Sequence, residues 1–71
     1  MKIEGTIDRV EMGTGTWALN GSDGTTYELK DAPPELQQSG LKVRIDGQIR
    51  EDVMTLAAIG PVLEVNSFEK L

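Results

Sequence analysis

Hydrophobic and polar residues alternate along most of this chain, and a period of two is typical of β-strands that bury one face. The first such strand covers residues 2–12 and begins with Ile3 and Ile7 on one face. The alternation then moves to even positions at Val10, so one extra residue is needed near Asp8–Arg9 to restore it. The pattern therefore predicts a β-bulge that bends the strand in its middle.

Two more strands are predicted to form a hairpin after a glycine-containing loop at residues 13–16. An Asn-Gly and an Asp-Gly dipeptide lie within residues 20–25, and these are the strongest short-range hairpin signals. The alternation on either side places two aromatic residues on the inward face, with Trp17 next to Leu19 and Tyr27 next to Leu29. An inverted parity would instead place Trp17 and Tyr27 together on the outer face.

Residues 31–40 change in character and predict one or two turns of helix. Two prolines and a glutamate suit a first helical turn, and Gly40 suits the residue after the last one. Such a short helix is not stable alone, so we expect Leu36 to pack into the core and hold it. Residues 41–50 then alternate without exception and give the clearest strand, in which Gly47 predicts a bend or a close backbone approach.

A fifth strand is predicted at residues 53–59, after a tight polar turn at Glu51-Asp52. This segment is apolar on both faces, whereas a strand with one face in water should not be. A Gly-Pro pair interrupts it, and residues 62–68 continue extended. Either the segment after residue 61 covers the second apolar face or another chain does, so the candidate self-association residues are Val53, Ala57 and Ile59.

Five short strands with one helical turn predict a closed or nearly closed all-β barrel. The bulged strand, the hairpin and the helical link resemble the OB-fold, a five-stranded Greek-key barrel with its helix between the third and fourth strands. In particular, the pattern L-x-x-S-G-L-x-V-x-I-x-G at residues 36–47 is similar to small stand-alone bacterial OB domains. The alternative is an SH3-like barrel, in which a helical turn lies between the last two strands. Here that link is expected to be only Glu51-Asp52, which favours the OB-fold.

Composition narrows the range of functions. The chain has 71 residues, a net charge of −5, and neither cysteine nor histidine. It therefore lacks the commonest general base, the commonest zinc ligands and every thiolate nucleophile. We expect one non-enzymatic domain without a cofactor or metal. No signal peptide or membrane span is visible, which predicts a cytoplasmic protein that does not enter a membrane.

The resemblance to OB-folds implies a ligand site on the second and third strands and their adjoining loops. The candidate surface there consists of eight residues: Thr14, Thr16, Ala18, Asn20, Asp23, Thr26, Glu28 and Lys30. It holds no aromatic side chain for base stacking, and an acidic protein repels phosphates. Binding of single-stranded nucleic acid or an oligosaccharide is therefore the second hypothesis.

Basic residues gather on the outward face of the fourth strand, where the candidate patch is Lys42, Arg44 and Arg50. Pairing of this row with Glu4, Asp8 or Glu64 on neighbouring strands is one interpretation, and docking of an anionic ligand or acidic partner is the other. The function predicted from the sequence is a binding module that contacts a protein partner or associates with itself as a homo-oligomer.

Overall fold

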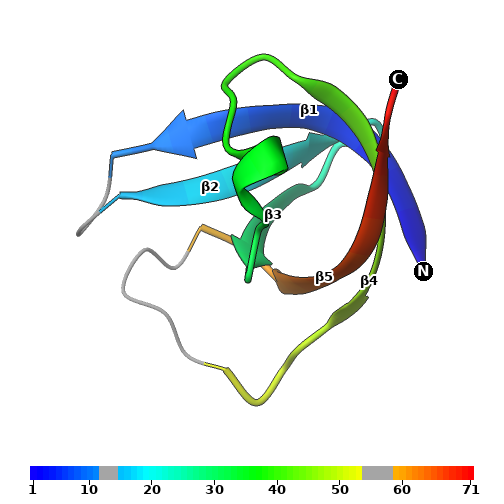
Figure 1. The fold of residues 1–71 in the computed structure, drawn as a ribbon. Coiled ribbons are helices and arrows are strands. Elements are labelled where there is room, and N and C mark those ends of the chain that lie inside the picture. Colours follow the sequence, from blue (N-terminus) through cyan, green and yellow to red (C-terminus); the bar gives the residue numbers. More distant parts are fainter. Residues whose placement is uncertain (12–14, 54–58) are drawn as a thin grey trace.

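A computed structural model of the chain describes residues 1–11, 15–53 and 59–71. Figure 1 shows the strands curled into a barrel with a helical turn against it. The elements are, in order, β1 (Lys2–Val10), β2 (Thr16–Gly21), β3 (Thr26–Lys30), the 3₁₀ turn η1 (Pro34–Leu36), β4 (Lys42–Ile49) and β5 (Val62–Lys70). The strands close in the order β1-β2-β3-β5-β4. The five-stranded all-β barrel with its helix between the third and fourth strands is thus confirmed.

Neighbouring strands of the barrel are antiparallel except for β3 and β5, which run parallel. Alternate residues from all five strands point inward and form one apolar core. Its buried members are Ile3, Ile7, Leu19, Tyr27, Leu29, Leu36, Val43, Ile45 and Leu63. The parity predicted for β2 and β3 is therefore correct, because Leu19, Tyr27 and Leu29 lie in this core.

The helical link is confirmed as one turn of 3₁₀ helix. Pro34 opens η1, where its missing N–H costs no hydrogen bond, and Leu36 is completely buried in the core as expected. The positive φ of Gly40 belongs to the loop after η1, where its N–H donates to the carbonyl oxygen of Ile7 at 2.7 Å. Gly40 therefore anchors the loop to β1 and does not end the helix.

The prediction of a fifth strand at residues 53–59 is wrong at both ends. Val53 and Ile59 belong to no strand, and residues 54–58 lie outside the described part of the chain. The fifth strand is β5, which starts at Val62 and includes the segment that was expected to continue extended. A turn does occupy residues 51–52, but the connection from β4 to β5 continues to residue 61. The short link that counted against an SH3-like barrel is therefore absent.

The bulge predicted near Asp8–Arg9 is also wrong, because the register of β1 against β2 and β4 is continuous. The irregularity lies between β4 and β5, where Asp46 pairs with Ser67 but Gly47 pairs with Val65. One extra residue of β5 is accommodated at this point. Gly47 makes the predicted close approach there, since a Cβ at this position would collide with the carbonyl oxygen of Glu64.

Candidate functional site

The outer face of β2 and β3, where a ligand was expected to bind, is buried at its centre. Ala18 and Glu28 lie opposite each other in the two strands, and they are only 1% and 5% exposed. The expectation that both side chains would face solvent is wrong. Of the other candidate residues, Asn20 and Asp23 are exposed, and half-buried positions are occupied by Thr16, Thr26 and Lys30. Thr14 lies outside the described residues.

This buried outer patch extends onto β5 and is covered by the chain itself. Val62 pairs with Glu28, shares its outward side and is 7% exposed. Just before β5, the carbonyl oxygen of Pro61 accepts the N–H of Glu28 at 2.9 Å. Gly60 lies so close to β3 that a Cβ would collide with the carbonyl oxygen of Thr26. The end of the β4–β5 connection therefore lies directly against β3.

Neither aromatic residue of the hairpin strands offers a free ring face for stacking. Trp17 is half-buried against the core, and the guanidinium of Arg9 lies 5.3 Å from the centre of its ring, at cation–π distance. Tyr27 is 6% exposed and donates its hydroxyl proton to Asp23 Oδ2 at 2.7 Å. Both rings are therefore engaged within the protein, Trp17 by Arg9 and the core and Tyr27 by the core.

Asp23 organises the turn between β2 and β3. Its Oδ1 accepts the N–H of Thr25 at 2.9 Å and its Oδ2 accepts the Tyr27 hydroxyl. These hydrogen bonds lower the pKa of the Asp23 carboxyl, because they stabilise its ionised form, and the bond from Thr25 has the larger effect. The same contact with Asp23 raises the pKa of Tyr27. The hairpin predicted at residues 20–25 is therefore confirmed, and its aspartate is ionised at neutral pH.

The predicted basic patch on β4 is largely neutralised by carboxylates. Arg44 donates to Glu4 on β1 at 2.6 and 2.9 Å and to Glu69 on β5 at 2.7 Å. Both carboxylates raise the pKa of Arg44, and Glu4 has the larger effect. Lys42 is exposed and forms no ion pair with the described residues. The arrangement supports the interpretation of a cross-strand charged face more than that of an anion site.

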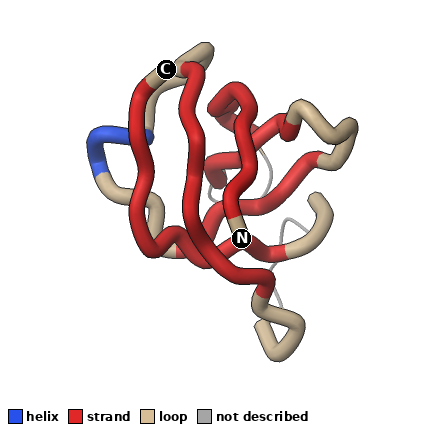
Figure 2. Tube along the Cα trace, turned by 90° about the vertical axis from the view of Figure 1, so that its right-hand side faces the viewer, coloured by secondary structure: helices blue, strands red, loops and turns tan. Residues whose placement is uncertain are grey.

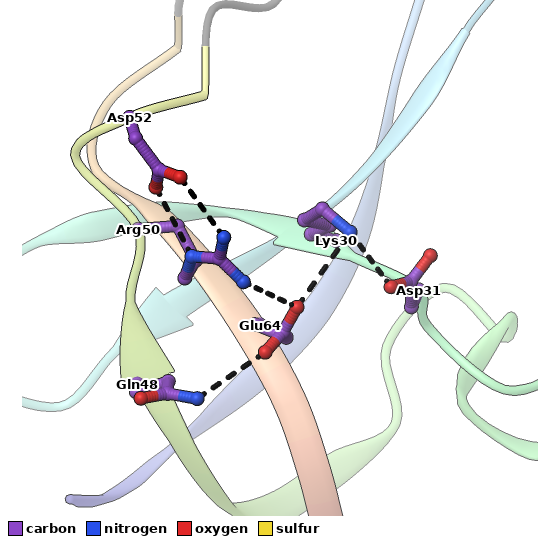
Figure 3. A network of polar contacts seen from close by, with 6 residues as sticks. All are labelled: Lys30, Asp31, Gln48, Arg50, Asp52 and Glu64. Carbon is purple, nitrogen blue, oxygen red and sulfur yellow. Dashed lines mark hydrogen bonds and ion pairs between the residues drawn. The ribbon is translucent and has the colours of Figure 1, made fainter.

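Arg50 belongs to a second polar network, centred on Glu64 (Figure 3). Glu64 accepts from Arg50 at 3.0 Å and from Gln48 at 3.3 Å, and its carboxylate lies 3.6 Å from the ammonium of Lys30. Arg50 also holds Asp52 through two hydrogen bonds of 3.0 and 3.1 Å. Asp52 raises the pKa of Arg50, and Arg50 lowers that of Asp52. The network fixes the start of the β4–β5 connection to β3 and β5.

A hollow of about 590 Å³ lies at the end of the barrel where β3 and β5 begin and β4 ends. Apolar side chains line most of it, with charged groups at Arg50 and Glu51. Its lining residues are Met1, Thr25, Tyr27, Ile49, Arg50, Glu51, Val53, Gly60, Pro61 and Val62. Val53, one of the candidate self-association residues, therefore lines this hollow. Ile59 is half-buried, and Ala57 lies outside the described residues.

Other kinds of site receive no support from the part of the chain that is described. No group of three or more acidic side chains there could hold a metal ion. None of the helices in that part is long and apolar enough to cross a membrane. The exposed large hydrophobic residues within it are Met1 and Leu71, which lie at the two ends of the chain.

The sequence indicated Glu64 as a partner of the basic row, and its contact with Arg50 confirms this. The contacts of Glu64 with Lys30 and Gln48 and the buried outer patch were missed, for the same reason. Lys30, Gln48 and Glu64 all have outward parity, but their contact depends on the register of β5 against both neighbours. That register could not be derived while β5 was placed at residues 53–59. Comparisons with protein-family models, curated proteins and solved structures found no match to this chain.

Proposed function

We propose that this protein is a non-enzymatic binding module of the OB type, and that it recognises an apolar side chain of a protein partner. The observation that carries the proposal is the hollow at the end of the barrel. Ile49, Val53 and Pro61 provide apolar walls there, and a concave apolar site of this size fits one or two side chains. Binding would remove this apolar surface from water, which is the main driving force for such contacts.

The topology supports the OB assignment. Strand order β1-β2-β3-β5-β4, a parallel β3–β5 pair, and a helical turn between β3 and β4 are all features of a five-stranded Greek-key barrel of this type. In an SH3-like barrel the helical turn would lie between the last two strands. The position of η1 therefore favours the OB-fold, although the length of the β4–β5 connection does not.

Binding of single-stranded nucleic acid or an oligosaccharide on the β2–β3 face is less well supported. The centre of that face is covered at Ala18 and Glu28, and neither Trp17 nor Tyr27 offers a free ring. The protein carries a net charge of −5, so phosphate groups would be repelled. Amide shifts within residues 16–30 on addition of a mixed oligonucleotide, lost at high salt, would contradict this reasoning.

A partner of different composition fits the hollow better than a second copy of the chain. Each copy has a net charge of −5, so two copies repel each other. A partner that presents an apolar side chain flanked by basic residues would be attracted to the same place. Self-association through Val53 is therefore the outcome that a concentration series must exclude.

The proposal can be tested by amide NMR with N-acetyl-phenylalanine amide as the probe. We expect dose-dependent shifts at Ile49, Val53 and Val62, and their loss in the variant Val53→Asn. Val10→Asn is the matched control, because it makes the same change at a half-buried position at the end of β1, away from the hollow. Absence of shifts in the unchanged protein would overturn the proposal. If the Val53 signal instead broadens as the protein concentration rises without any probe, the hollow is a site of self-association.

A further inference from the structure

β5 is longer than its partner β3, and most of one side of it has no neighbouring strand. The parallel pairing with β3 joins Val62, Leu63 and Glu64 to residues 28–30. The chain then turns away at Asp31, the only described residue other than glycine with a positive φ, which is 58°. From Val65 to Lys70 the side of β5 opposite β4 therefore meets no strand among the described residues.

The turn η1 lies on that side of β5 but does not complete the sheet. Figure 2 shows the strand that ends at the C-terminus with a neighbouring strand on one side and, on the other, the blue turn and its loops. None of the backbone hydrogen bonds between described residues joins η1 or its flanking loops to β5. The backbone groups on this side of β5 are thus left for water or for another chain.

The register shows which residues present those backbone groups. The N–H of Leu71 donates to the carbonyl oxygen of Lys42 at 3.0 Å, so Leu71 faces β4. In an antiparallel pair the facing residues alternate, so Glu69 also faces β4, while Phe68 and Lys70 direct their N–H and C=O groups away from it. Two donors and two acceptors with strand spacing therefore point away from β4, in the plane of the sheet.

Three of the four residues along this part of β5 are exposed. Lys70 and Glu69 are exposed, as is Ser67, while Phe68 is half-buried and packs its ring against the core. A strand added here would place one side chain next to the exposed part of Phe68. On the opposite face, another side chain would lie next to Glu69.

We infer that the outer edge of β5, at Phe68 and Lys70, binds an extended segment of a protein partner by strand addition. This mode of recognition uses main-chain hydrogen bonds for affinity and alternate side chains for specificity. The inference rests on the proposed role as a protein-binding module, but it concerns a different surface from the hollow. The segment that fits has an apolar residue opposite Phe68 and a basic residue opposite Glu69.

A second copy of the chain is a poorer occupant of this edge. Two antiparallel copies of β5 can pair the free backbone groups of both Phe68 and Lys70 in only one register. In that register Phe68 of one copy lies opposite Lys70 of the other. That register places Glu69 directly opposite its own counterpart, and like charges in this position destabilise a sheet. The net charge of −5 on each copy acts in the same direction.

The test uses the acetylated and amidated pentapeptide Lys-Val-Lys-Val-Lys and two variants at one position. Lys70→Pro removes the outward N–H without removing a donor to β4, and proline is tolerated where the N–H of an edge strand faces solvent. Lys70→Ala is the matched control, because it removes the side chain but keeps the N–H. We expect Lys70→Pro to weaken binding about tenfold, the effect of one lost hydrogen bond, and Lys70→Ala to change it less than about twofold. Equal affinities of the two variants would overturn the inference.

Hydrogen exchange gives an independent measurement that does not depend on a variant. In the free protein the amides of Phe68 and Lys70 should exchange faster than that of Glu69, and the peptide should slow them. Slow exchange at both amides in the free protein would show that the edge is already occupied, which overturns the inference. Amide shifts that the peptide causes at Val53 and not at Phe68 would also overturn the inference, but the proposal for the hollow would stand. If Val53→Asn abolishes binding of N-acetyl-phenylalanine amide but leaves the peptide affinity unchanged, the hollow and the edge of β5 are two distinct binding surfaces.

Discussion

Two outward faces of the same barrel have opposite character. On β1 and β4 most of the outward residues are charged, and all are at least partly exposed, as in the ion pairs of Arg44 with Glu4 and Glu69. On β2 and β3 the outward residues Ala18 and Glu28 are buried as deeply as parts of the core. Alternation therefore determines which side of a sheet a residue occupies, but not whether that side meets water.

The covered face depends on small residues and on the segment just before β5. Ala18 presents only a methyl group, and Gly60 allows the backbone before β5 to lie against Thr26. On the other face long side chains form cross-strand pairs, as between Arg44 on β4 and Glu4 on β1. A large or charged residue at either small position should therefore destroy the covered face and leave the charged face intact.

The largest effect is expected from Ala18→Asp. The change places a carboxylate at a position that is 1% exposed and opposite Glu28, so it combines desolvation with like-charge repulsion. We expect a loss of about 3 kcal/mol or more in the free energy of unfolding, measured by urea denaturation. Asn20→Asp is the matched control on the same face of β2. It is exposed, so its effect should stay within about 0.5 kcal/mol. Equal losses in the two variants would show that the outer face is open at Ala18.

The strands with a strict alternation were located correctly from the sequence, whereas the strand predicted at residues 53–59 is wrong at its two described ends, Val53 and Ile59. Residues such as Ile7, Leu19 and Ile45 follow a local rule, since each strand needs one apolar face. The segment at residues 53–59 has apolar residues on both faces, so alternation alone could not tell a strand from a connection. The contacts of Glu64 with Lys30 and Gln48 depend on pairings between residues far apart in the chain, and no local pattern encodes those. Of the candidate residues, the parity of Trp17 and Tyr27 was predictable, but the covering of Ala18 was not.

A smaller loss is expected from Gly60→Ala, which acts on the covering segment itself. The added Cβ collides with the carbonyl oxygen of Thr26, so the backbone before β5 has to move away from β3. We expect a loss of about 1–3 kcal/mol, by analogy with overpacking of a tight contact. Glu51→Ala is the control in the same connection, because Glu51 is exposed and should tolerate the change. A stability equal to that of the control would show that Gly60 is not held against β3.

Tyr27→Phe tests the polar end of the hairpin, with an effect smaller than that of Gly60→Ala. The hydrogen bond to Asp23 lowers the pKa of Asp23 and raises that of Tyr27. Its contribution is therefore present between about pH 4 and pH 10, and it is lost below the pKa of Asp23 and above that of Tyr27. In the variant, NMR titration should show the Asp23 pKa closer to its ordinary value, with part of the lowering kept by Thr25. An unchanged Asp23 pKa would contradict this contact.

The smallest effect is expected on the charged face, from Arg44→Gln. Lys42→Gln is its matched control, because both variants lose one positive charge from a protein of net charge −5, but only Arg44 is held by Glu4 and Glu69. We expect Arg44→Gln to lower the melting temperature by no more than about 3 °C relative to Lys42→Gln, since exposed ion pairs contribute little. High salt should remove this difference, because it screens exposed charges. A larger difference that persists in salt would mean that the charged face is packed as tightly as the covered one, and the contrast between the two faces would fail.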